Sequence, residues 1–118
     1  GSPGPGIRFR PEDKTNFTLM LKAVRERLDA LSRTNRRRKT DRYTLSIATA
    51  GGRYFERTEM DRLHVYVDWI NMMTYDFFTS GSKTTGHHAA LFPSADAMTT
   101  QHLAAGIPAR KLVIGVPF

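Results

Sequence analysis

The first half of the chain shows helical spacing of apolar residues and then a strand-like run. From Pro11 onward, apolar side chains recur every three or four positions, which predicts a helix lying on a sheet. They are Phe17, Leu21, Val24, Leu28 and Leu31. Residues 43–50 then favour a β-strand and end at Gly51-Gly52, a turn that lets the backbone approach a ligand.

The next segment predicts a second helix and a second strand. Thr58, with Asp61 three residues later, is typical of a helix N-cap, and the helix should extend to about Tyr66. Residues 68–75 then read as a strand that is buried on both faces. Such strands are typical of parallel sheets, in which a helix connects one strand to the next.

The last part of the chain predicts a long loop, a short helix and a third strand. The loop covers 78–93 and should border a cleft, since loops of this length are usually functional or disordered. Ser94 is a plausible N-cap and Gly106 a plausible C-cap for the helix, and the strand covers 111–116. Strands separated by helices indicate parallel pairing with right-handed crossovers.

The two faces of the predicted strand 68–75 carry different chemistry. Ile70 and Met72 point to one face by the period-two rule. The other face carries an amide, a thioether and a phenol, from Asn71, Met73 and Tyr75. Asp76 follows at the expected strand end. Since loops at the carboxyl ends of barrel strands carry active sites, the pattern places the function at Tyr75 and Asp76.

Positive charge is concentrated in one segment. The 118-residue chain carries a net charge of +7, and residues 33–42 hold six basic side chains against one acid, which leaves +2 for the rest. Such a run can bind phosphate backbones, but it contains no interleaved aromatic residue. We interpret it as a solvated helix-to-strand loop opposite the active site. Nucleic-acid binding remains a control hypothesis, and we expect no nucleic-acid partner.

Composition limits the other possibilities. The chain contains no cysteine, which excludes disulfides and thiolate metal sites. It has no run of about 18 apolar residues, so we expect no membrane span. His87 and His88 are adjacent, but no third ligand stands at a recognised spacing. We therefore expect neither a metal nor a cofactor.

The segment Met73-Thr74-Tyr75-Asp76 resembles the Met-x-Tyr-Asp motif of the family 18 glycoside hydrolases, the chitinases and their relatives. Other segments resemble bacterial chitinase segments in the same order. They are residues 43–50, 85–89, 104–109 and 111–118. The resemblance therefore covers nearly the whole chain.

This resemblance implies an α/β fold that is part of a TIM (β/α)8 barrel, with about three βα units from after strand 4 through strand 7. A closed barrel typically needs about 250 residues. The family's catalytic signature, Asp-x-x-Asp-x-Asp-x-Glu, is absent from the sequence. We expect residues 1–118 to be a fragment of one catalytic domain, inactive alone, in which residues 1–10 form a Gly/Pro-rich loop. Gly1-Ser2 also fits a cloning remnant or a flexible linker.

The resemblance also implies a mechanism and roles for three residues. The 2-acetamido oxygen of the substrate attacks C1, while a Glu outside this chain protonates the leaving oxygen. Tyr75 would hold that acetamido oxygen, Asp76 would bond the sugar and bias nearby carboxylates, and Met73 would form the apolar floor. The structural alternatives are a core phenol for Tyr75, a turn or cap for Asp76 and core packing for Met73.

Three further residues are candidates for sugar contact. Tyr54 and Phe55 follow the Gly51-Gly52 turn and are possible stacking platforms. His87 belongs to the resembled loop segment and would hydrogen-bond near the cleft. These residues complete the predicted substrate-binding set.

The sequence leaves two function hypotheses. In the first, the parent protein is a chitinase that hydrolyses β-1,4-N-acetylglucosamine linkages in chitin or its oligosaccharides. In the second, it is a lectin-like relative that binds the glycan without cleaving it, because the deciding Glu lies outside the chain. Under either hypothesis we expect an extracellular, monomeric parent without a membrane partner.

Overall fold

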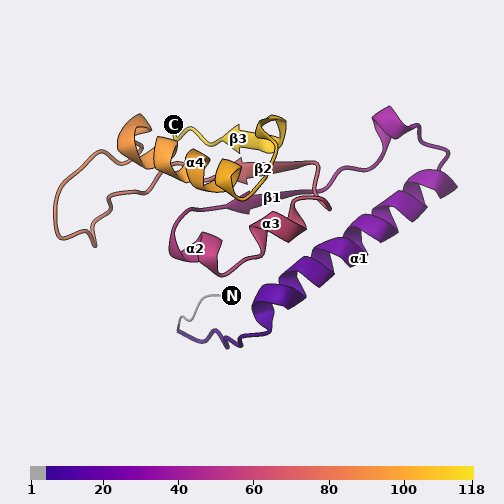
Figure 1. Cartoon of the computed structure of the whole chain (residues 1–118), viewed down its shortest axis with the longest axis horizontal. Helices are drawn as coiled ribbons and strands as arrows, with labels where there is room; N and C mark the ends of the chain where they lie inside the picture. Colours follow the sequence, from indigo (N-terminus) through magenta and orange to yellow (C-terminus); the bar gives the residue numbers. More distant parts are fainter. Residues whose placement is uncertain (1–4) are drawn as a thin grey trace.

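The computed structural model describes residues 5–118, and its elements alternate between helices and short parallel strands. In chain order they are α1 (Asp13–Thr34), β1 (Ser46–Thr49), α2 (Arg53–Glu56), α3 (Met60–Leu63), β2 (Trp69–Met72), α4 (Asp96–Ala104) and β3 (Leu112–Ile114). Short helical turns also occur at Lys39–Asp41, Leu91–Ala95 and Ala109–Lys111. Figure 1 shows the strands at the centre, with α1 as a long diagonal helix.

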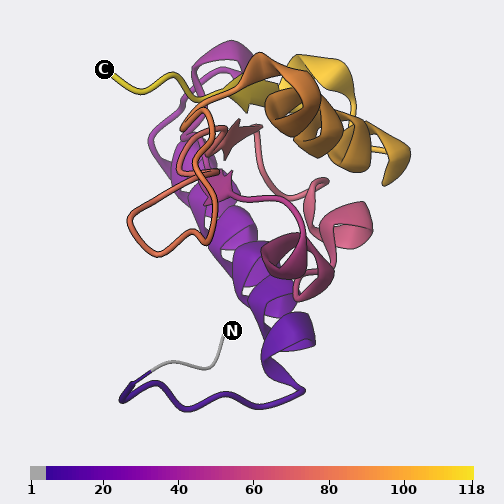
Figure 2. The same cartoon turned by 90° about the vertical axis from the view of Figure 1, so that its left-hand side faces the viewer.

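The sheet has the order β1-β2-β3, and both pairings are parallel, as the sequence predicts. Ile47 lies opposite Ile70, and Ile70 lies opposite Leu112. Helices connect each strand to the next, and Figure 2 shows them around one side of the strands. The α/β class and the three helix-connected strands are thus confirmed.

Several predicted boundaries are wrong. Strand β2 ends at Met72 instead of residue 75, because the chain turns there: Thr74 N donates to Met72 O at 2.9 Å. The helix expected over 58–66 is the four-residue α3, and the four-residue α2 was not predicted. Such short helices have too few positions to show a periodic apolar pattern.

The buried stripe of α1 also differs from the prediction. It consists of Thr18, Leu21, Arg25 and Ser32. Val24 and Leu31, which were expected to face the sheet, are 38% and 43% exposed. Two of its polar members, Arg25 and Ser32, tolerate burial because they are paired: Arg25 Nη2 donates to Tyr43 O at 2.8 Å, and Ser32 Oγ donates to Leu28 O at 2.8 Å.

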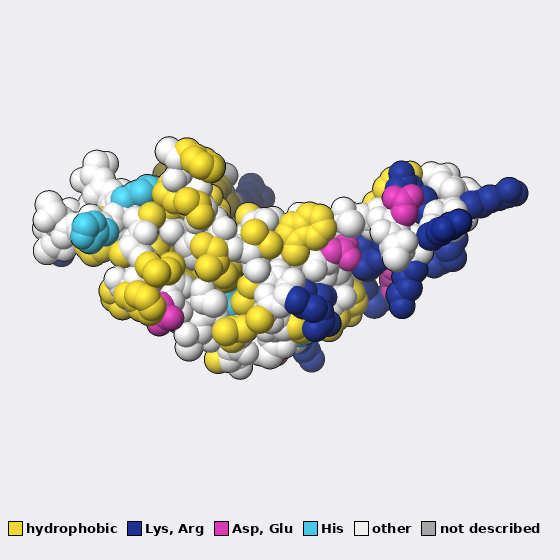
Figure 3. Space-filling view, turned by 90° about the horizontal axis from the view of Figure 1, so that it is seen from above, with side chains coloured by type: hydrophobic (Ala, Val, Ile, Leu, Met, Phe, Trp, Pro, Cys, Tyr) yellow, Lys and Arg dark blue, Asp and Glu magenta, His cyan; other side chains and the backbone are white. Residues whose placement is uncertain are grey.

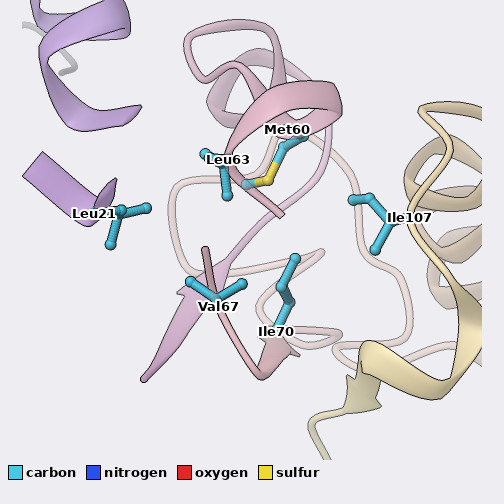
Figure 4. Close-up of a cluster of buried hydrophobic side chains, with 6 residues drawn as sticks. All are labelled: Leu21, Met60, Leu63, Val67, Ile70 and Ile107. Atoms are coloured by element: carbon cyan, nitrogen blue, oxygen red, sulfur yellow. The ribbon is translucent and has the colours of Figure 1, made fainter. Parts of the chain in front are cut away.

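The hydrophobic core joins α1, α3 and β2 to the segment before β3. It consists of Leu21, Met60, Leu63, Val67, Ile70 and Ile107. Figure 4 shows these side chains converging from separate parts of the chain. Burial of several large aliphatic side chains, each worth about 1.5 to 3 kcal/mol, stabilises the helix-covered face of the sheet.

The opposite face of the sheet is open, which corrects the expectation that β2 is enclosed on both faces. Ile70 and Met72 are buried, whereas Asn71 on the other face is only half-buried. Its neighbours in the register are Ala48, which is exposed, and Val113, which is 44% exposed. Within the described residues, this face has no covering layer.

The basic segment 33–42 lies where α1 ends, and Figure 3 shows Lys and Arg side chains gathered at that end of the molecule. Residues 33–41 are exposed, which agrees with the predicted solvated loop, whereas Arg42 is half-buried. Arg42 forms ion pairs with Asp29 and Asp68, and the Arg37 guanidinium lies 4.3 Å from the centre of the Tyr43 ring. The segment therefore helps to fix α1 to the sheet. Of the predicted N-terminal loop 1–10, residues 1–4 lie outside the described residues, and residues 5–10 contain no helix.

Candidate active site

A cleft of about 1470 Å³ opens at the carboxyl ends of β1 and β2. The two strand ends, the turn after β1 and the first residues of α4 form its walls. Residues that line it include Thr49, Tyr54, Met73, Tyr75, Asp76 and Gln101. The carboxyl ends of parallel strands meet at one edge, so side chains from separate βα units share this cleft.

The chain leaving β2 directs two predicted residues into the cleft. Met73 is held in place by its N–H, which donates to Thr49 O at 2.8 Å, and its side chain is 37% exposed. Thr74 is buried and turned away from the cleft, and Tyr75 lines the cleft again. The alternation predicted for Met73 and Tyr75 therefore persists beyond the end of the strand.

Asp76 also lines the cleft, and its backbone adopts the left-handed conformation with φ 59°. Asp tolerates this region better than most residues because its short polar side chain can bond locally. Its carboxylate lies 3.4 Å from His88 Nδ1, and both side chains are well exposed. This contact is an ion pair only when His88 is protonated, and its exposure keeps it weak.

His88, which was not among the predicted site residues, is thus the histidine beside Asp76. His87 is exposed and does not line the cleft. Phe77 N donates to His88 O at 3.0 Å, which brings the end of the loop back to the end of β2. The adjacent histidines were visible in the sequence, but this loop closure was not.

The loop itself differs from expectation as well. Residues 78–93, which we expected to border the cleft, are not among those that line it. Only their neighbours Phe77 and Ser94 do so. Figure 1 shows this loop extending away from the sheet. The cleft is bordered instead by α4, whose residue Gln101 accepts a hydrogen bond from Gly52 N at 3.0 Å.

The two aromatic candidates after β1, Tyr54 and Phe55, lie in different environments. Tyr54 is 63% exposed and lines the cleft. Phe55 packs against the hydrophobic core, and its ring meets His102 edge-on with centroids 4.8 Å apart. The structure therefore brings Tyr54, but not Phe55, to the cleft.

His102 lies completely buried beneath Phe55 on α4. Its Nδ1 is 2.7 Å from Met98 O, so Nδ1 carries the proton and donates it to that carbonyl. Burial lowers the pKa of His102, although the bond to Met98 opposes this effect. The ring is neutral near pH 7 and serves as a packing group.

Within residues 5–118, no three His, Cys, Asp or Glu side chains are grouped so that they could hold a metal ion. The same part of the chain contains no helix with the length and apolar character needed to cross a membrane.

Comparison with known proteins shows which family this chain is related to. The sequence profile of Glycosyl hydrolases family 18 matches residues 3–118. The chain belongs to glycosyl hydrolase family 18. Among curated members, it is 41% identical to chitinase A1 of Niallia circulans over 96% of this chain. It spans 18% of the length of that enzyme, so it corresponds to one part of a chitinase-type glycoside hydrolase.

Solved structures show the same correspondence. A class V chitinase of Nicotiana tobaccum in complex with NAG4 superposes with a TM-score of 0.82 and 29% identity, over 95% of this chain and 34% of that chain. A chitinase-like agglutinin of Robinia pseudoacacia superposes with a TM-score of 0.80 and 32% identity, over 92% of this chain and 34% of that chain. The three parallel strands thus match part of the family 18 barrel.

The cleft of this family 18 chain combines hydrogen-bonding groups with apolar and aromatic surface. The Tyr75 phenol is a neutral donor at the cleft wall, and the adjacent Asp76 carboxylate accepts hydrogen bonds and carries charge. Met73 and Tyr54 supply apolar and aromatic surface beside them. Polar groups on an apolar floor suit a sugar ring, which has hydroxyls at its rim and C–H groups on its faces.

Proposed function

We propose that the full protein containing this chain hydrolyses β-1,4-N-acetylglucosamine linkages in chitin, with Tyr75 and Asp76 as catalytic residues. One observation supports this above all. Tyr75, Asp76 and Met73 line a single cleft at the carboxyl ends of two parallel strands, in a chain of family 18. The full protein is the protein that contains this chain together with the rest of its barrel.

The proposed reaction uses the substrate's own 2-acetamido group. Its carbonyl oxygen attacks C1 while a carboxylic acid outside this chain protonates the leaving oxygen, so the configuration at C1 is retained after water attacks. The Tyr75 phenol donates a hydrogen bond to the acetamido group and holds it against C1. A neutral donor suits this role because it orients the nucleophile without competing for the positive charge that develops on the sugar.

Asp76 acts beside Tyr75 in this proposal. Its carboxylate accepts a hydrogen bond from the sugar, and its charge raises the pKa of a neighbouring acid, since two nearby carboxylates resist ionising together. Met73 provides the floor and Tyr54 a side wall for the sugar. Substrate-contact roles for Phe55 and His87 stay predictions, and the proposal does not rest on them because neither lines the cleft.

The proposed ligands are chitin and N-acetylglucosamine oligosaccharides. The tobacco class V chitinase in complex with NAG4 supports this choice, because 95% of the present chain superposes on it. A monomeric state and an extracellular location also stay predictions.

Glycan binding without hydrolysis is a second candidate. The similarity to the Robinia agglutinin favours it, because a chitinase-like protein described as an agglutinin shares this part of the fold. Both hypotheses predict sugar in the cleft. Only the first predicts cleavage.

One assay separates the two candidates. The full protein is incubated with N-acetylglucosamine tetramers to hexamers, and NMR records shorter products and their anomeric configuration. We expect shorter oligomers that appear first as the β-anomer. Binding measured by calorimetry without any product would support the agglutinin-like function, and α-anomers would contradict the substrate-assisted mechanism.

A further inference from the structure

The chain after β2 forms a tight turn that is fastened to the end of β3. Thr74 N donates to Met72 O at 2.9 Å, a three-residue turn of the kind found at strand ends. Gly115 N donates to the same carbonyl, also at 2.9 Å. Met72 O therefore accepts two hydrogen bonds, one from Thr74 just after β2 and one from Gly115 just after β3.

The Thr74 side chain adds a third bond between these segments. Its hydroxyl donates to Gly115 O at 2.7 Å, and the residue is only 3% exposed. A buried hydroxyl without a partner is costly, so this bond fixes which way Thr74 faces. Thr74 and Gly115 each bond to the other's segment, and we call this pair the Thr74–Gly115 latch.

Gly115 also lies close to the ring of Tyr75, which connects the latch to that side chain. A Cβ added at Gly115 would lie 2.6 Å from Met72 O and 3.0 Å from Tyr75 Cε1, so there is no room for a side chain. Gly115 does not have the positive φ that favours glycine elsewhere. Glycine is required here because two stretches of backbone and the Tyr75 ring approach one another closely.

We propose that Thr74 and Gly115 are positioning residues, which set the direction of the Tyr75 phenol in the cleft. The inference rests on the proposed function, in which Tyr75 is catalytic. Thr74 turns the chain so that Tyr75 faces the cleft, and the bare backbone of Gly115 supports one edge of the ring. Neither residue needs to touch the substrate for this role.

A double-mutant cycle in the full protein tests this role. Thr74→Val removes the hydroxyl but keeps the shape, and it should lower kcat about 10-fold while KM changes about twofold or less. Thr74→Ser keeps the hydroxyl and should restore most of kcat. In a Tyr75→Phe background, Thr74→Val should change kcat less than about twofold, because residues that act through one another are not additive.

Thr99→Val is the matched control. Thr99 Oγ1 also donates to a backbone carbonyl, Ala95 O, at 2.8 Å, but Thr99 does not line the cleft. This variant should lose a similar amount of stability and leave kcat unchanged. If Thr74→Val lowers kcat by the same factor in the unsubstituted protein and in the Tyr75→Phe background, Thr74 does not act through Tyr75. That result would overturn the inference. If Tyr75→Phe alone leaves kcat unchanged, the catalytic role proposed for Tyr75 is contradicted, independently of Thr74.

A second measurement needs neither turnover nor the Thr74→Val variant. NMR of ring-labelled tyrosines in the full protein follows Tyr75 directly, with Tyr43 as the internal reference. Gly115→Ala places a methyl against both Met72 O and the Tyr75 ring, so the latch must shift. The variant should therefore move the Tyr75 resonance and leave Tyr43 in place. An unshifted Tyr75 resonance in a folded Gly115→Ala protein would overturn the inference.

Discussion

Arg25 on α1 forms an ion pair with Asp68, which directly precedes β2, with Nη1 3.1 Å from Oδ2. Their side chains are 8% and 17% exposed. The same carboxylate accepts the Leu45 N–H at 2.8 Å and pairs with Arg42. Asp29 joins the network, and although burial alone would raise its pKa, hydrogen bonds and charge from Arg25 and Arg42 hold the pKa of Asp29 below its usual value. The network fixes α1 to the end of the sheet remote from the cleft.

Asp68→Asn should therefore destabilise the full protein strongly. Removing one partner of a largely buried ion pair leaves an uncompensated charge, which typically costs about 3 kcal/mol. Chemical denaturation measures this loss. Glu26→Gln is the control, because the Lys22–Glu26 pair is exposed, and it should cost about 0.5 kcal/mol or less. Equal losses for the two variants would show that the network does not fix α1.

His102 predicts a loss of stability in acid. Burial lowers the pKa of His102 in the folded state below its ordinary value of 6.5, so the unfolded state binds the proton more readily. The resulting stability is fully present above pH 6.5 and is lost as the pH falls from there toward the folded pKa. Thermal unfolding of the full protein across this range measures the effect.

His102→Leu should flatten this pH dependence relative to the unsubstituted protein. His64 must be compared separately, since burial and the charge of Lys111 also lower its pKa, and His64→Gln reports that contribution. If His102→Leu and the unsubstituted protein lose stability in parallel, the buried imidazole is not the group responsible.

Gly52 should be sensitive to substitution because of its backbone conformation. Its φ of 58° and ψ of −130° lie in the mirror image of the β region, which glycine alone enters readily. Gly52→Ala should cost about 1 to 3 kcal/mol and, by displacing α2 with Tyr54, weaken binding of N-acetylglucosamine oligomers. Denaturation and calorimetry measure the two effects. Gly81→Ala has no such strain and should change neither, so matching effects at the two glycines would contradict this account.

Asp76→Asn should keep the fold and change the chemistry. Asn also tolerates the left-handed conformation found at this position, so stability should be preserved. Loss of the carboxylate should lower kcat and shift the pH profile of kcat/KM, because a charge beside the catalytic acid is removed. Glu26→Gln again serves as the control. An unmoved pH profile would leave Asp76 as a turn residue.

The fold was largely predictable because its main signals are local. Helical spacing from Phe17 to Leu31 and the apolar strand around Ile70 identify α1 and β2 without knowledge of other segments. The side that α1 buries could not be predicted. Arg25 belongs to that side only because Asp68, 43 residues away, pairs with it. A pattern of apolar residues cannot reveal a buried cation whose partner is distant.

The lining of the candidate cleft was predictable to a similar extent. Tyr75 and Asp76 follow from the strand pattern and the motif, and both line the cleft. The end of β2 at Met72, the contact between Asp76 and His88 and the support of Tyr75 by Gly115 all depend on segments that meet only in the folded chain. The same holds for Phe55, whose place in the core is set by its contact with His102 on α4.

The most direct test of the central claim is the turnover of Tyr75→Phe in the full protein, measured with N-acetylglucosamine oligomers. Phenylalanine keeps the ring but removes the hydroxyl that is proposed to hold the acetamido group. The account predicts that kcat falls about 10 to 1000-fold, the range typical for loss of one oriented donor, while KM changes much less. An unchanged kcat in a correctly folded variant would contradict it.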